Sequence, residues 1–198
     1  MRKRKFSEML LEEAMPLIGA DAFIAWTLDA PPRPPSDHLN ETLRRLSVFD
    51  TLGSEAAKLL LMDAMLTEIV PNHERLKVWK GKPLVSATLT GFADYLITPR
   101  YAYIKTPLLC AAEAKKDDFE QGRAQCVAEL AACREKNQAD GHELDIFGFV
   151  SNGQFWQFYK LTTASEIYET SEYGINDLPG LLGALDYICA ECAKRVPA

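Results

Sequence analysis

Two stretches of the chain, GFADYLITP at residues 91–99 and PLLCAAEAKK at residues 107–116, decide the fold that the sequence predicts. Both contain short apolar runs of the kind that form buried strands. Asp94 lies in the first stretch, and Glu113 follows the apolar run of the second. Two adjacent strands would place these carboxylates side by side at one end of a sheet. Lys115, two residues after Glu113, would point to the same face of its strand, because side chains alternate along a strand.

The pattern around these stretches predicts a mixed sheet flanked by helices. An apolar stripe at helical spacing indicates a helix that begins at Ser54, as its N-cap, and ends near Ile69. Asn152 and Gly153 form the expected turn between two strands. Helices and strands succeed one another in the order of an α/β fold. The expected helices are residues 54–69, 118–136 and 177–194, and the expected strands are residues 76–80, 84–97, 108–112, 146–150, 155–161 and, at the edge of the sheet, 166–170.

The N-terminal part differs in character from the rest. Residues 7–18 have the pattern of a short amphipathic helix, and residues 22–28 that of a strand or a buried edge. The stretch DAPPRPPSD at residues 29–37 holds four prolines in five positions, which a regular helix or strand does not tolerate. We therefore expect residues 1–36 to be a helical and extended appendage with a stiff Pro-rich linker, followed by a main domain of residues 37–198.

The composition is typical of a globular protein without a membrane segment. Of the 198 residues, 47% are hydrophobic and 25% are charged, as in an ordinary folded domain. No apolar run approaches the roughly 20 residues that span a bilayer. The basic start of the chain is not followed by a continuous apolar segment, because Glu8, Glu12 and Glu13 interrupt it. No secretion signal and a cytoplasmic location are therefore expected.

The cysteines point in the same direction. There are five, an odd number at irregular spacing, which argues against a disulfide framework. Cys189 and Cys192 form a single CxxC within an expected helix, and no second pair or suitably spaced histidine completes a zinc site. Small buried thiols in a reducing compartment are the favoured interpretation.

The charges are unevenly distributed along the chain. The net charge of −6 argues against a strong general nucleic-acid binder. However, the segment from Arg75 to Lys116 carries eight basic residues and only two acids, Asp94 and Glu113. Taken singly, either acid is more often a surface carboxylate. Together, among many basic residues, they indicate a metal site that faces phosphate.

Phosphodiester hydrolysis needs a nucleophilic water, a neutralised phosphate and a stabilised leaving oxygen, all of which a divalent cation can provide. Mg²⁺ prefers carboxylate oxygens and keeps several of its waters. Two carboxylates at neighbouring strand ends supply such a site. A lysine on the same face can hold the attacking water or offset charge in the transition state.

With QGRAQC at residues 121–126 and VSNGQFWQFYKL at residues 150–161 added, the chain resembles the core of the PD-(D/E)XK nuclease superfamily. The resemblance covers roughly residues 50–165. Within that superfamily the chain is most similar to the N-terminal nuclease-like domain of type I restriction enzyme R subunits. It also resembles small uncharacterised cyanobacterial and other bacterial proteins that carry an EAKxDDF box. The resemblance implies a restriction endonuclease-like αβββαβ core.

The resemblance also implies roles for individual residues. Asp94 and Glu113 match the family's metal ligands, and the backbone carbonyl of Ala114 matches the third, with Mg²⁺ or Mn²⁺ as the metal. Lys115 matches the catalytic lysine. One position departs from the motif: Ala93 stands where the family's name has a proline.

Two further positions are matched on the flanking helices. Gln125 corresponds to the family's glutamine on the helix after the motif, and Gln121, one turn away, is the alternative. Glu55 corresponds to the acid on the first helix, with Glu68 as the fallback. The aromatic residue that commonly follows the glutamine by four positions is Glu129 here, which weakens the match of Gln125.

The function expected from these residues is metal-dependent hydrolysis of DNA, as an endo- or exodeoxyribonuclease. The small size and the acidic net charge favour an alternative, a catalytically silent nucleic-acid-binding or assembly module on the same fold. A third hypothesis is an unrelated α/β protein in which the motif is accidental. The expected partners are DNA, bound weakly by the chain alone, a second copy in a homodimer and, for an assembly module, another protein; no membrane is expected.

Overall fold

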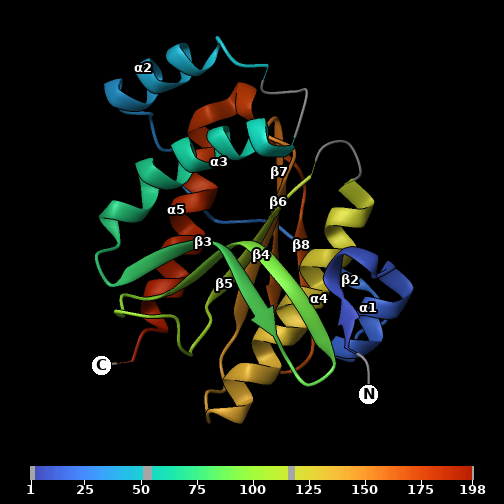
Figure 1. Cartoon of the computed structure of the whole chain (residues 1–198). Coiled ribbons are helices and arrows are strands. Elements are labelled where there is room, and N and C mark those ends of the chain that lie inside the picture. Colours follow the sequence, from blue (N-terminus) through green and yellow to red (C-terminus); the bar gives the residue numbers. More distant parts are fainter. Residues whose placement is uncertain (1–2, 51–54, 116–118, 198) are drawn as a thin grey trace.

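The apolar stretches of the sequence form the strands of one mixed sheet, which has helices against both faces (Figure 1). The structure is a computed structural model that describes residues 3–50, 55–115 and 119–197. The helices are α1 (Leu11–Ile18), α2 (Asp37–Leu46), α3 (Glu55–Ile69), α4 (Phe119–Ala139) and α5 (Leu178–Lys194). The strands are β1 (Arg4–Lys5), β2 (Phe23–Trp26), β3 (Leu76–Val85), β4 (Leu89–Pro99), β5 (Cys110–Ala114), β6 (Ile146–Ser151), β7 (Phe155–Leu161), β8 (Ile167–Thr170) and β9 (Tyr173–Gly174).

These nine strands lie in the order β1-β4-β5-β6-β7-β8-β2, with β3 paired to β4 and β9 to β7. The pairs β3–β4, β4–β5, β6–β7 and β7–β8 are antiparallel, whereas β5–β6 and β2–β8 are parallel. A parallel pair needs a crossover, and α4 provides it between β5 and β6. The predicted α/β fold, a mixed sheet flanked by helices, is therefore confirmed.

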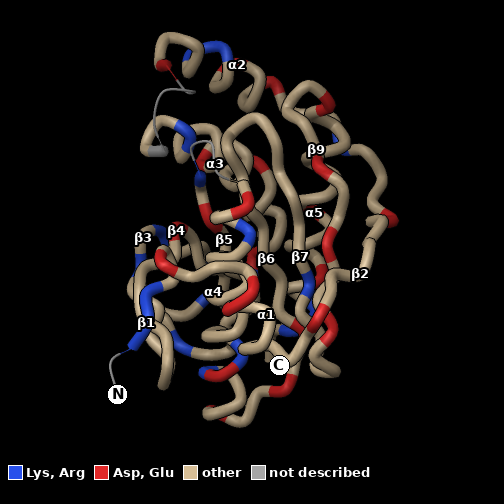
Figure 2. Tube along the Cα trace, turned by 90° about the vertical axis from the view of Figure 1, so that its right-hand side faces the viewer, with Lys and Arg blue, Asp and Glu red and all other residues tan. Residues whose placement is uncertain are grey.

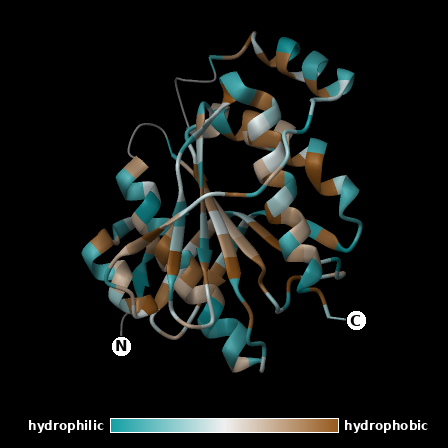
Figure 3. Cartoon of the chain, turned by 180° about the vertical axis from the view of Figure 1, so that it is seen from behind, coloured by the Kyte–Doolittle hydropathy of each residue, from teal (hydrophilic) through white to brown (hydrophobic). Residues whose placement is uncertain are grey.

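Alternation along the central strands divides the core into two layers. Phe147 and Phe149 of β6 pack in the cluster that contains the buried side chains of α3 and α5. Ile146 and Val150 of the same strand pack in the cluster of α1 and α4. Strands buried on both faces read as continuous apolar runs, as β5 and β6 do. Figure 3 shows the resulting hydrophobic colouring of the central strands, with hydrophilic residues on the outer helices.

Several predicted boundaries were wrong, for local reasons. The first hairpin has strands at Leu76–Val85 and Leu89–Pro99, whereas we expected residues 76–80 and 84–97. Strand β3 continues through Pro83 because it is an edge strand, where the missing N–H of proline is tolerated. The expected helix at residues 7–18 is a 3₁₀ turn, Phe6–Glu8, followed by α1.

Two elements escaped the sequence pattern. Helix α2 was not expected; the Ser36 side chain caps it by accepting from the Leu39 N–H at 3.1 Å. Strand β8 was predicted to lie at the edge of the sheet. It is an internal strand instead, because β2 pairs with it in parallel on its outer side. The predicted N-cap Ser54 lies outside the described residues.

The N-terminal segment joins the same sheet and core. Strand β1 pairs with the start of β4, and β2 pairs with β8. Phe6 and Ile18 are buried against α4 in the second core layer. The Pro-rich stretch crosses α5, where Arg33 binds Asp186 at 2.8 Å and His73 binds the same carboxylate at 2.9 Å.

All five cysteines are free and buried, which confirms the expectation of unpaired core thiols. No helix in the described parts of the chain is long and apolar enough to cross a membrane.

Asn137 near the end of α4 holds the segment that leads into β5. It is 1% exposed; its Oδ1 accepts from the Leu108 N–H at 2.7 Å, and its Nδ2 donates to the Leu108 carbonyl at 2.8 Å. Asn137→Ala leaves both buried backbone groups unpaired, so it should lower the free energy of unfolding by about 2 kcal/mol. Urea unfolding measures this. Gln138→Ala, at the neighbouring exposed position, is the control, and an equal effect of both changes would contradict the prediction.

Candidate functional site

The two acids of the motif meet where β4 and β5 separate. The β4–β5 ladder pairs Ile97 with Cys110 and ends at the pair of Tyr95 with Ala112. In the same register the next pair is Asp94 with Glu113. There a side-chain hydrogen bond takes the place of the backbone hydrogen bonds between the strands: Asp94 Oδ2 accepts from the Ala114 N–H at 2.8 Å. The predicted proximity of Asp94 and Glu113 is thus present at the end of these two strands.

Lys115 binds two of its predicted neighbours. Its Nζ lies 2.9 Å from Glu113 Oε1 and donates to Gln125 Oε1 at 2.9 Å. The lysine side chain is only 13% exposed. Its backbone N–H donates to the Ser151 carbonyl at 2.9 Å, which continues the β5–β6 pairing by one residue. Hydrogen bonds therefore fix both the backbone and the ammonium group of Lys115.

Glu129 belongs to the same cluster, although no role was predicted for it from the sequence. It lies one turn after Gln125 on α4, is fully buried, and accepts from Gln125 Nε2 at 3.1 Å. It had been treated only as the missing aromatic of the family pattern. The available signal was its spacing, since residues four apart on a helix share a face, and Gln125 was expected to face the site.

Burial and mutual repulsion raise the pKa of both glutamates. Loss of solvent and the charge of Asp94 raise the pKa of Glu113 to about 7, although the Lys115 ammonium opposes the shift. Burial raises the pKa of Glu129 well above its usual range, and the Glu113 charge adds to this. Glu113 Oε2 and Glu129 Oε2 are buried, and neither accepts an N–H within the described residues. A proton kept on Glu129 can be shared with the Glu113 carboxylate, which eases the repulsion between the two side chains.

Close packing fixes the start of α4 against this cluster. A Cβ atom on Gly122 would lie 2.7 Å from Lys115 Cγ and 2.7 Å from Val150 Cγ1, so only glycine allows this approach. The helix can therefore bring Gln125 and Glu129 down to the ends of β5 and β6.

The other residues matched by resemblance have different positions. Gln121 Nε2 donates to the backbone carbonyls of Ser7 and Met9, in the N-terminal segment. Glu68 accepts from the backbone N–H and the hydroxyl of Ser36 at 2.9 and 2.7 Å, at the start of α2. Glu55 begins α3, but its side chain lies outside the described residues. Of the two glutamines, Gln125 is the one that contacts Lys115.

The donor set suits a hard cation. Asp94 and Glu113 offer carboxylate oxygens, and one of these is the buried Glu113 Oε2. Ala114, whose N–H is bound by Asp94, adds a backbone carbonyl. Mg²⁺ binds through one or two carboxylates and retains waters, so this set fits it. Within the described chain, no group of three or more His, Cys, Asp and Glu side chains is placed to hold a metal. Metal binding here would therefore rely on water ligands.

The wider surroundings are basic on one side. Lys and Arg residues follow β1 and the β3–β4 hairpin (Figure 2), in agreement with the basic segment found in the sequence. The fold and the cluster together define a mixed α/β protein with two carboxylates and a lysine at adjoining strand ends. No protein-family model matches the chain. A search of curated proteins finds no match either.

Proposed function

We propose that this chain is a metal-dependent nuclease-like protein of the PD-(D/E)XK superfamily, which hydrolyses phosphodiester bonds in DNA. The observation that carries the proposal is the meeting of Asp94, Glu113 and Lys115 at the separating ends of β4 and β5. The element order α3-β3-β4-β5-α4-β6 also agrees with a restriction endonuclease-like αβββαβ core.

Asp94, Glu113 and the Ala114 carbonyl would hold Mg²⁺ or Mn²⁺. When bound, such an ion neutralises phosphate charge and lowers the pKa of a coordinated water. Lys115 would orient the attacking water and offset charge that develops on the phosphate. Gln125 keeps the lysine ammonium in place, and Glu129 in turn holds the Gln125 amide. Gln125 and Glu129 therefore act as positioning residues.

The burial of the cluster favours a second candidate function, a catalytically silent nucleic-acid-binding or assembly module. Glu113 is 5% exposed, and the Lys115 ammonium already has two partners. A buried, internally paired cluster of this kind can serve to specify the fold. The net charge of −6 also disfavours tight binding of DNA by the chain alone.

Calorimetry with Mn²⁺ separates the two functions. Asp94→Asn keeps an oxygen that can accept the Ala114 N–H but removes the negative charge, so the fold should persist while metal affinity falls at least tenfold, an order-of-magnitude expectation for a lost carboxylate ligand. Glu172→Gln, a change at an exposed acid, is the matched control. Cleavage of plasmid and single-stranded DNA with Mg²⁺ or Mn²⁺ then tests catalysis. If the wild-type chain binds no Mn²⁺, the nuclease proposal fails.

A further inference from the structure

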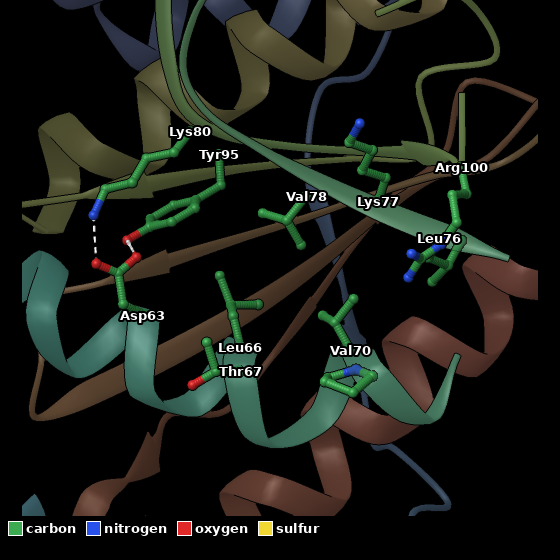
Figure 4. Close-up of a pocket in the computed structure, with 11 residues that line it drawn as sticks. Asp63, Leu66, Thr67, Val70, Leu76, Lys77, Val78, Lys80, Tyr95 and Arg100 are labelled. Carbon is green, nitrogen blue, oxygen red and sulfur yellow. Dashed lines mark hydrogen bonds and ion pairs between the residues drawn. The ribbon is translucent and has the colours of Figure 1, made fainter. Parts of the chain in front are cut away.

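A cavity lies between α3 and the β3–β4 hairpin, apart from the carboxylate cluster (Figure 4). Its volume is about 420 Å³. Its lining belongs to the core layer under α3 and α5, whereas Glu113 contacts α4, so the two sites lie on opposite faces of the sheet. In Figure 4, side chains of α3 face side chains of the sheet across the cavity. The apolar lining consists of Leu66, Val70, Pro71, Leu76, Val78 and Tyr95.

The charged residues around the cavity are mostly basic. Lys77, Lys80 and Arg100 line it together with a single acid, Asp63. That acid is already neutralised, because it binds Lys80 Nζ and accepts from the Tyr95 hydroxyl at 2.9 Å. The Arg100 guanidinium therefore leaves a positive charge at the cavity that no lining carboxylate balances.

The Arg100 side chain is available for a ligand. Its Nε donates to the Glu74 carbonyl at 2.7 Å, which fixes the plane of the guanidinium group. Its terminal nitrogens form no hydrogen bond with any described residue. The Lys77 ammonium points away from the cavity (Figure 4), because its Nζ lies 4.2 Å from the ring centroid of Trp79 and donates to the Tyr101 carbonyl at 3.2 Å. A fixed guanidinium suits a carboxylate, which accepts two parallel N–H groups.

The lining also favours a ligand with an apolar body, because the hydroxyl groups that line the cavity are already hydrogen-bonded within the protein. The Thr67 hydroxyl donates to the Ala64 carbonyl of its own helix at 2.9 Å, and the Tyr95 hydroxyl is bound to Asp63. A polar body would therefore lose hydrogen bonds with water and gain few in return. The volume falls within the range of roughly 300–1,000 Å³ that is usual for small-molecule sites.

We propose that this cavity binds a small amphipathic anion, with a hydrocarbon body between α3 and β3 and one carboxylate at the Arg100 guanidinium. The apolar lining and the unbalanced charge of Arg100 carry this inference. It does not depend on the proposed nuclease function, since no residue of the carboxylate cluster lines the cavity.

Four probes test the proposal by isothermal calorimetry and amide chemical-shift titration: decanoate and 2-naphthoate, each with its neutral counterpart, decanol and 2-naphthol. The carboxylates should bind more tightly than the alcohols, and whichever carboxylate binds better identifies an aliphatic or an aromatic body. Arg100→Gln should weaken binding of the carboxylate about fivefold and leave the affinity for the alcohol unchanged, as expected for a partly exposed charge-assisted pair. Val78→Trp should fill the cavity and abolish binding of both.

Lys82→Gln is the control, because Lys82 lies on β3 but does not line the cavity. The proposal is overturned if neither carboxylate binds at millimolar concentration. Equal affinity for acid and alcohol would overturn the anionic part of it. Unchanged affinity in a folded Val78→Trp variant, judged by circular dichroism, would place binding elsewhere on the molecule.

Discussion

Lys115→Met is expected to reduce metal-dependent DNA cleavage by a factor of ~10²–10⁴, the usual contribution of a positioned group that handles protons and charge. Methionine keeps most of the aliphatic stem that packs against α4 and removes only the ammonium. That ammonium lies 2.9 Å from Glu113 Oε1 and 2.9 Å from Gln125 Oε1. Under the proposed function it would offset the charge that develops on the phosphate. Initial rates on a supercoiled plasmid measure the loss.

Metal binding distinguishes a catalytic lysine from a structural one. Lys115→Met removes a cation beside Glu113, so Mn²⁺ affinity should be retained or increased while cleavage is lost. Lys82→Met, at an exposed position of β3, controls for the loss of one positive charge and should cleave like the wild type. Equal activity of the wild type and Lys115→Met would exclude the assigned role. Loss of Mn²⁺ binding in Lys115→Met would show that the lysine maintains the site structurally.

The carboxylate pair could be predicted because it depends on local order. An apolar run on either side of a short connection gives two adjacent strands, and Asp94 and Glu113 then fall at matching ends of them. The register is fixed by burial on both faces, since a one-residue slip would reverse every side chain. The motif spacing therefore contained the geometry of the site.

Other features had no local signal. Strand β8 became internal through its pairing with β2, which lies far away in the sequence. Helix α2 buries only Leu39 fully, so its pattern is mostly polar, and its position depends on Ser36 and Glu68. Tertiary contacts of this kind override what propensity and periodicity can show.

Glu129 shows the same limit within the site. A glutamate in a helix is ordinarily assigned to the solvent face, because an unpaired buried carboxylate is costly. Here the Gln125 amide donates to Glu129, and the raised pKa favours the neutral carboxyl, so the cost of burial is reduced. Only these positions in space identify Glu129 as part of the cluster.

Glu113 should make the protein less stable as the pH rises from about 4.5 to 7. Burial raises the pKa of Glu113 from 4.5 to about 7 in the folded state. Below pH 4.5 the group is protonated in both states and contributes no difference. Between these values the unfolded chain ionises and the folded chain does not, so unfolding becomes more favourable. Above pH 7 the accumulated loss is constant, and it amounts to about 3 kcal/mol at 1.36 kcal/mol per pH unit.

Urea unfolding of the wild type and Glu113→Gln at pH 5 and pH 8 measures this loss. The amide cannot ionise, so the wild type should lose about 2–3 kcal/mol relative to Glu113→Gln between the two pH values, because a small part of the loss already falls below pH 5. Comparing the change with pH removes any constant cost of the substitution. Glu172→Gln controls for the loss of one negative charge at an exposed position. Parallel pH profiles of the wild type and Glu113→Gln would contradict the raised pKa.

Adding Mn²⁺ at pH 8 links this titration to the proposed metal site. A cation at Glu113 stabilises the ionised carboxylate, so it should restore stability to the wild type, by about 2.7 kcal/mol when free Mn²⁺ is 100 times its dissociation constant. Glu113→Gln should gain much less, because it lacks one carboxylate ligand. If Mn²⁺ stabilises both proteins equally, Glu113 does not bind the ion. If it stabilises neither while the pH effect is present, the raised pKa reflects burial alone, and the silent-module alternative is favoured over the nuclease.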